Sequence, residues 1–130
     1  MNGYFVAAAA LVCVVGLVHS VLGEILIFRR LRQPGRLVPT RGGTLLGEGH
    51  VRILWASWHI VTVFGWAIGA LLLRMAWPSD LESVAAFAAD TFALSALAAS
   101  ALVLFGTRAK HPGWIGLLAI AVCTWLGQAA

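Results

Sequence analysis

The sequence predicts an all-α integral membrane protein, in which four transmembrane helices form an up-down bundle. Three observations predict this fold class. Of the 130 residues, 61% are hydrophobic and only 11% are charged, whereas a soluble domain carries about 25% charged residues. The apolar residues form four long runs, and the basic residues gather in short segments beside them. This composition excludes an ordinary soluble enzyme, a coiled coil and a disordered chain.

The four apolar runs set the expected positions of the helices. A helix that crosses the hydrocarbon layer needs about 20 mostly apolar residues. The expected spans are residues 4–28, 51–77, 80–105 and 112–126, within a single transmembrane domain that covers residues 1–130. No positive charge precedes the first run and arginines follow it, so we expect a retained helix and not a cleaved signal peptide.

The basic loops predict the orientation of the chain. Five arginines lie in the loop at residues 29–50, and the loop at residues 106–111 carries Arg108 and Lys110. The connection between the second and third spans is short and acidic. The positive-inside rule therefore predicts that both basic loops are cytoplasmic and that both termini are outside, in the periplasm. The expected location is the inner membrane of a bacterium.

The net charge of +4 points to lipids as partners. In a soluble protein a basic balance indicates nucleic acid, but membrane topology explains these basic residues, so we expect no nucleic-acid partner. The arginines just after the first span are expected to hold anionic lipid headgroups. They are Arg29, Arg30 and Arg32.

Residues typical of helix ends support these boundaries. The run from Ser79 to Glu82 has the pattern of a capping box, in which Ser79 caps the third helix and Glu82 reaches back. Gly106 is placed to end that helix, and Pro112 suits the first turn of the fourth.

Small residues predict how the helices touch. The third span is rich in alanine between residues 85 and 101, which predicts a central position for it. Gly65 and Gly69 allow a close helix contact, either within the chain or in a homo-oligomer.

Two histidines are predicted at one level of the membrane. His19 and His59 each lie nine residues from the cytoplasmic end of their spans, roughly 13 Å deep. Trp55 and Trp66 share the helix face of His59, and such a stripe can wall a flat cofactor such as haem. The alternative is that these aromatic side chains only fill space between the helices.

Ionisable groups inside a span are costly, so each is a functional hypothesis. The candidate ligands of a transition metal are His19, His59 and Glu24, and two histidines also match the axial ligands of haem iron. The alternative for Glu24 is a structural ion pair with Arg52 or Arg108, which are expected at comparable depth.

Asp90 is the deepest carboxylate of the third span. It lies about ten residues, hence about 15 Å, below the outer end of that helix. One interpretation is a hydrogen bond to a Trp indole or to a backbone carbonyl. The other makes Asp90 a station of a proton or cation path that includes His59 and His19.

The function predicted from these residues is a binding one. Neither a Walker spacing nor a Gly-x-Ser-x-Gly elbow is present in the sequence, so nucleotide binding and hydrolysis have no support. We expect an accessory subunit or binding protein of a membrane complex, whose His19/His59 site holds a metal or haem. The alternative is a small oligomeric transporter that couples ions through Asp90, Glu24 and the histidines. An enzyme is the least favoured class.

Overall fold

The computed structural model describes residues 1–129, and within them the chain is helical and forms no strand. The elements are α1 (Gly3–Gly23), the π-helical segment η1 (Glu24–Phe28), α2 (Glu48–Met75), α3 (Leu81–Thr107) and α4 (Gly113–Ala129). Each predicted span overlaps one of the four α-helices, with ends shifted by a few residues. The predicted all-helical fold class is confirmed.

The lengths of the helices divide them into two groups. The segments Gly3–Phe28, Glu48–Met75 and Leu81–Thr107 have 26, 28 and 27 residues and are apolar enough to cross a membrane. They indicate a membrane protein, as predicted. The 17 residues of α4 rise only about 25 Å, less than the hydrocarbon thickness of about 30 Å. A fourth span and the orientation of the termini stay predictions.

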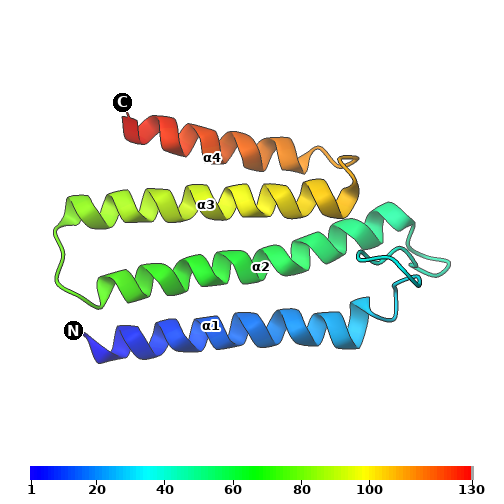
Figure 1. Cartoon of the computed structure of the whole chain (residues 1–130), viewed down its shortest axis with the longest axis horizontal. Helices are drawn as coiled ribbons and strands as arrows, with labels where there is room; N and C mark the ends of the chain where they lie inside the picture. Colours follow the sequence, from blue (N-terminus) through cyan, green and yellow to red (C-terminus); the bar gives the residue numbers. More distant parts are fainter. Residues whose placement is uncertain (130) are drawn as a thin grey trace.

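The bundle is flat. The four helices lie side by side in one layer, in chain order, and alternate in direction (Figure 1). α1 packs on α2, α2 on α3 and α3 on α4, and among the described residues no comparable contact joins α1 to α4. The alternation follows from the short α2–α3 and α3–α4 connections. Because the layer does not close, only α2 and α3 have a helix on both sides.

Small residues let the helices approach each other. Ala93, Ala96 and Ala99 are buried on α3, in agreement with the central position predicted for this helix. Gly69 faces α1, since a Cβ added there would lie 3.2 Å from Cys13 Sγ. Gly69 therefore serves packing within the chain, the first of the two alternatives for the glycine pair.

Most of α1 remains uncovered. Its buried residues are Ala9, Gly16 and Gly23, all of them small, whereas most of its large apolar side chains are exposed. Leucine and valine side chains need no protein partner in lipid, so this surface is consistent with a helix that faces the bilayer.

The N-terminus of α3 differs from the predicted capping box. Asp80, not Ser79, is the N-cap, and its carboxylate accepts a hydrogen bond from Ser83 N at 2.7 Å. The hydroxyl of Ser79 donates to the carbonyl of Trp77 at 3.2 Å. Asp80 has the extended backbone that an N-cap needs, with φ −72° and ψ 157°, and aspartate is among the preferred capping residues.

The C-terminus of α3 also lies beyond its predicted end. Gly106 remains helical, and the cap is Arg108, whose backbone is left-handed at φ 54° and ψ 45°. Gly106 lies in a close contact between the helices, because a Cβ there would lie 3.2 Å from Ala56 Cβ on α2. Pro112 directly precedes α4, and its carbonyl accepts a hydrogen bond from Ile115 N.

The long basic loop folds back on the end of the layer where α2 begins (Figure 1). The backbone N–H groups of Thr40 and Arg41 both donate to the carbonyl of Leu31, at 3.0 and 2.9 Å. Val38 and Pro39 are buried. The loop thus has a defined path beside the N-terminus of α2 and the α3–α4 connection.

Candidate anion-binding site

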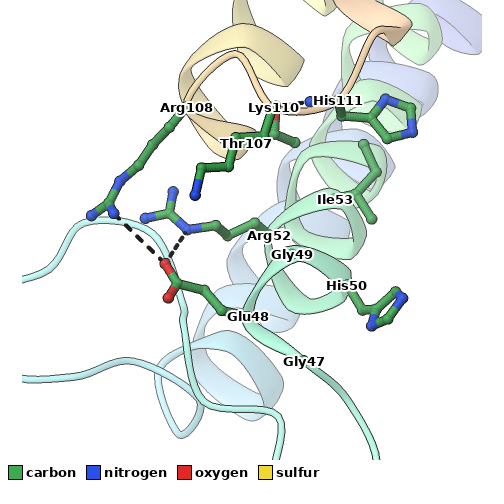
Figure 2. Close-up of a pocket in the computed structure, with 10 residues that line it drawn as sticks. All are labelled: Gly47, Glu48, Gly49, His50, Arg52, Ile53, Thr107, Arg108, Lys110 and His111. Atoms are coloured by element: carbon green, nitrogen blue, oxygen red, sulfur yellow. Dashed lines mark hydrogen bonds and ion pairs between the residues drawn. The ribbon is translucent and has the colours of Figure 1, made fainter.

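A cavity of about 370 Å³ lies where α2 begins and α3 ends (Figure 2). Two chain segments that are far apart in the sequence line it. They contribute Gly47, Glu48, Gly49, His50, Arg52, Ile53, Thr107, Arg108, Lys110 and His111. Figure 2 shows the side chains of Arg52, Arg108 and Lys110 directed to the same side of the cavity, near Glu48.

The start of α2 contributes a helix N-terminus to the cavity. Its N-cap is Gly47, which has an extended backbone and makes no side-chain capping bond. Helix N-termini carry free N–H groups and the positive end of the helix dipole, and both favour a bound anion.

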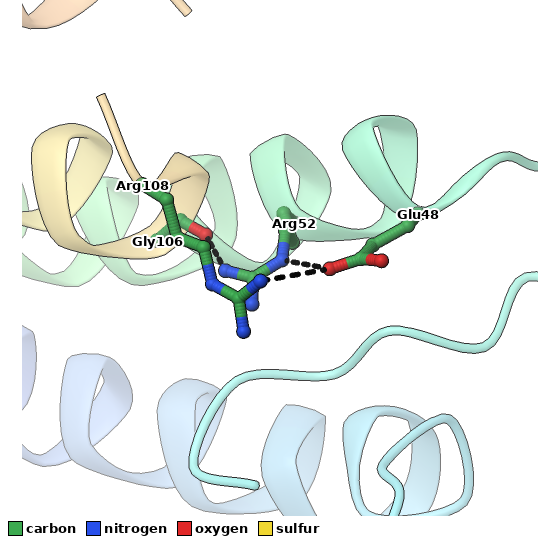
Figure 3. Close-up of polar contacts among 4 residues, drawn as sticks. All are labelled: Glu48, Arg52, Gly106 and Arg108. Carbon is green, nitrogen blue, oxygen red and sulfur yellow. Dashed lines mark hydrogen bonds and ion pairs between the residues drawn. The ribbon is translucent and has the colours of Figure 1, made fainter. Parts of the chain in front are cut away.

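Arg52 is the buried cation of the site, with 6% of its surface exposed. Its Nε donates to Glu48 Oε1 at 2.8 Å, and its Nη1 donates to the carbonyl of Gly106 at 2.6 Å (Figure 3). A buried charge is tolerated only with such partners. Because one bond reaches α2 and the other reaches α3, Arg52 has a fixed position between the two helices.

Arg108 approaches the same carboxylate from α3. Its Nη1 lies 3.8 Å from Glu48 Oε1 (Figure 3). Arg108 and Ala109 both have positive φ angles, 54° and 62°, a conformation that costs an L-residue about 1 kcal/mol or more. Backbone strain of this kind is often found at binding sites. Here it occurs in the connection that brings Arg108 to the lining of the cavity.

The charges of the cavity do not balance. Arg52, Arg108 and Lys110 face a single carboxylate, that of Glu48. Guanidinium groups bind phosphate and carboxylate oxygens through paired N–H donors. The arrangement is therefore suited to a phosphate-bearing anion.

A second cavity of about 390 Å³ shares two residues with the first. Arg52 and Arg108 line both. The other lining residues of the second cavity come from loop residues 35–38 and from Leu104 and Phe105 near the end of α3.

The predicted histidine site lies elsewhere, between α1 and α2, and His59 takes part in a chain of hydrogen bonds there. Thr62 Oγ1 donates to the carbonyl of Gly16 at 3.1 Å, and Ser20 Oγ lies 2.8 Å from Thr62 Oγ1. Ser20 Oγ also lies 2.9 Å from His59 Nδ1. Since Thr62 uses its one proton on a carbonyl, Ser20 donates to Thr62 and must accept from His59, so Nδ1 carries a proton.

Two tryptophans of α2 donate hydrogen bonds to the backbone of α1. Trp58 Nε1 donates to the carbonyl of His19 at 3.1 Å, and the two rings stack at 4.3 Å with an interplanar angle of 6°. Trp66 Nε1 donates to the carbonyl of Cys13 at 3.2 Å. These contacts support the space-filling interpretation, because Trp66 is bound to α1 and the Trp58 indole occupies the face of His19.

The other residues of the predicted cofactor site do not form a group of metal ligands. Trp55 meets His59 edge-on, with ring centroids 4.9 Å apart. His19 Nε2 and Trp55 Nε1 are buried without a hydrogen-bond partner. In residues 1–129, no three His, Cys, Asp or Glu side chains are grouped so that they could hold a metal ion.

Glu24 pairs with Arg32, which lies four residues after the end of η1. Arg32 Nη2 lies 2.5 Å from Glu24 Oε1. The expected pairing of Glu24 with Arg52 or Arg108 is wrong, because both of those arginines meet Glu48. Arg32 is thereby engaged within the chain, whereas Arg29 is exposed, as is its neighbour Arg30.

Asp90 lies apart from the histidines. It is exposed on α3, and its carboxylate accepts a hydrogen bond from Gln128 Nε2 on α4 at 3.2 Å. This partner is neither a Trp indole nor a backbone carbonyl. Since His19 and His59 lie on the α1–α2 side of the layer, the structure does not join the three residues in one path.

Comparison with known proteins gives no family for this chain: no protein family, curated protein or solved structure matches it. The candidate function must therefore come from the site itself. From the sequence, Arg108 and Lys110 are assigned to membrane orientation and Arg52 to an ion pair with Glu24, and the cavity that the three residues line is not predicted. One feature of the sequence could have indicated it. Glu48 and Arg52 are four residues apart and so can pair on one helix face, which leaves the basic segment with Arg108 and Lys110 without an acidic partner of its own.

Proposed function

We propose that this membrane protein binds the phosphate group of an anionic lipid in the cavity between the start of α2 and the α3–α4 connection. One observation carries the proposal: Arg52, Arg108 and Lys110 converge on a single cavity in which Glu48 is the one carboxylate. Basic pockets at the ends of transmembrane helices are a common mode of acidic headgroup recognition.

The local electrostatics support a bound anion. The guanidinium of Arg52 is fixed by two hydrogen bonds but has five N–H groups, so further donors remain for a ligand. The N-terminus of α2 adds its positive dipole end. The site also needs little rearrangement to bind, because Arg52 is already ordered.

The position of the cavity favours a lipid over a soluble anion. Ile53 lines it directly, and Leu104 and Phe105 line the adjoining cavity. Leu104 and Phe105 are exposed on α3, with 40% and 57% of their surfaces accessible. A lipid can place its phosphate at the arginines and its apolar chains along these side chains.

The role of the α1–α2 histidines in this proposal is structural. The bonds of Trp58, Thr62 and Trp66 to α1 hold the two helices together without a ligand. The transporter alternative needs Asp90 and the histidines on one path, and their separation across the layer gives it no support.

The test compares three probes on the purified protein in neutral detergent. We expect phosphatidylglycerol to bind and to raise the melting temperature, phosphatidylcholine to do neither, and inorganic phosphate to bind far more weakly. Lys110→Gln and Arg108→Gln should each weaken phosphatidylglycerol binding about fivefold, the effect of roughly 1 kcal/mol per basic residue.

The matched control is Arg41→Gln, which removes an exposed arginine of the basic loop that lines neither cavity. It should bind as the wild type does. Equal binding of phosphatidylcholine, or unchanged affinity in both cavity variants, would overturn the proposal. Phosphate binding as tight as lipid binding would replace the lipid by a soluble anion.

A further inference from the structure

The two cavities meet at a shared pair of arginines. Arg52 and Arg108 line both the cavity of about 370 Å³ and the cavity of about 390 Å³. A ligand that extends from one cavity into the other must therefore pass these two guanidinium groups. Each cavity is large enough for a phosphate group and the atoms next to it.

Each cavity also has a basic residue of its own. Lys110 lines only the first cavity, and Arg36 lines only the second. Together with the shared Arg52 and Arg108, each cavity thus has three basic residues. Across both cavities four basic residues face one carboxylate, that of Glu48, which leaves a strong positive excess for a ligand to compensate.

We infer that the site selects a lipid headgroup that carries two phosphates, with one phosphate in each cavity and the shared arginines between them. This inference rests on the proposed function and names its ligand class. A lipid with a single phosphate compensates the charge of only one cavity. A second phosphate brings a second negative charge to the second cavity, which Arg36 lines.

Arg52 and Arg108 have enough hydrogen-bond donors to bind a phosphate in each of the two cavities. A guanidinium has five N–H groups, and Arg52 uses Nε and one N–H of Nη1 for Glu48 and the Gly106 carbonyl. Arg108 lies 3.8 Å from the carboxylate of Glu48, beyond normal hydrogen-bond length. Within the described chain, most of the N–H groups of this pair are thus free to bind phosphate oxygens.

The apolar lining indicates a lipid and not a soluble diphosphate. Leu104 and Phe105 line the second cavity from the last turns of α3, next to the surface on which acyl chains would lie. A ligand with a phosphate in each cavity can therefore keep its chains in contact with α3.

The experiment titrates the full-length protein in neutral detergent with cardiolipin or phosphatidylglycerol, at matched phosphate concentration, and reads binding by native mass spectrometry. Wild type should bind cardiolipin about tenfold more tightly, a difference of about 1.4 kcal/mol. Arg36→Gln should remove this preference and leave phosphatidylglycerol binding unchanged. Lys110→Gln should weaken the binding of both lipids.

Arg41→Gln is the control, because it lowers the charge of the same loop without altering either cavity. It should keep the preference. Equal binding of both lipids by wild type would overturn the two-phosphate inference while the proposed lipid binding stands. Loss of the preference in Arg41→Gln would also overturn it, since bulk loop charge would then be the cause. Binding of neither lipid would refute the proposed function itself.

Discussion

Arg52 Nε donates a hydrogen bond to the carboxylate of Glu48, one helical turn earlier on α2, at 2.8 Å. The same carboxylate oxygen lies 3.8 Å from Arg108 Nη1. One carboxylate therefore faces two guanidinium groups at the end of the layer. Glu48 therefore competes with an anionic ligand for the charge of these two guanidinium groups.

Replacement of Glu48 by glutamine should strengthen the binding of anionic lipid. The change removes the one negative charge of the cavity, and a unit charge at about 4 Å in water corresponds to about a fivefold change in affinity. Titration with phosphatidylglycerol in low salt measures the effect. Glu82→Gln, the same change at the opposite end of the layer, is the control and should leave the affinity unchanged. Weaker binding by Glu48→Gln would contradict competition.

The strained connection after α3 should show a conflict between stability and binding. Arg108→Gly relieves a left-handed residue and should stabilise the fold by about 1 kcal/mol, yet it removes a cationic side chain and weakens lipid binding. Ala109→Gly relieves the neighbouring residue and should stabilise the protein without loss of binding. Thermal melting and lipid titration of both variants separate the two effects. A lower melting temperature for Arg108→Gly would show that the left-handed conformation is not strained.

Close contact between α1 and α2 depends on Gly23. A Cβ added there would press into the indole of Trp58, which is held by its bond to the His19 carbonyl. Gly23→Ala should therefore destabilise the protein by about 2 kcal/mol, a usual cost of overpacking. Gly116→Ala is the control, because a Cβ at Gly116 meets open space. The readout is the unfolding free energy in a denaturing detergent titration, and equal values for both variants would contradict this packing.

The hydrogen-bond chain at His59 should affect stability and leave lipid binding unchanged. Ser20→Ala interrupts the chain between Thr62 and His59 and should cost about 0.6 kcal/mol, the average for such bonds in membranes. Ser57→Ala, at an exposed position on α2, should cost nothing measurable. Altered phosphatidylglycerol affinity in Ser20→Ala would instead link the chain to the cavity.

The cap of α3 should make stability depend on acid pH. Hydrogen bonding from the Ser83 backbone N–H lowers the pKa of the Asp80 carboxyl below its ordinary value. A lowered pKa means that the stabilisation is complete above the ordinary aspartate pKa and is lost as the pH falls through the folded-state pKa. Asp80→Asn keeps an acceptor that does not titrate, so its melting temperature should fall less in acid. If the melting temperatures of wild type and Asp80→Asn fell in parallel with pH, the Asp80 cap would not be the cause of the acid sensitivity.

The helices can be predicted from the sequence because each depends on a local property. Apolar runs long enough to cross a membrane specify α1, α2 and α3, and the alanines of α3 specify its central place. The cap of α3 is less certain from sequence, since Ser79 and Asp80 are adjacent and both are good capping residues. The backbone conformation of Asp80, which the sequence does not reveal, decides between them.

Ion pairs and cavities depend on contacts between distant segments, which the sequence alone does not specify. Equal depth predicts a pair between Glu24 and Arg52 or Arg108, but the chain after η1 brings Arg32 to Glu24 instead. The basic cavity forms because Gly106 lets α3 approach α2 closely enough for Arg52 to reach its carbonyl. Such contacts between distant segments follow from packing and not from spacing along one helix.

The flat layer also decides how much of each helix meets its surroundings. In a closed bundle a central helix is covered by protein on every side, whereas a helix in one layer has neighbours only at its two edges (Figure 1). In a bilayer, α2 and α3 would therefore meet lipid on both broad faces of the layer, as α1 does on its open side. A change of lipid composition would then act on every helix directly and not only on the outer ones.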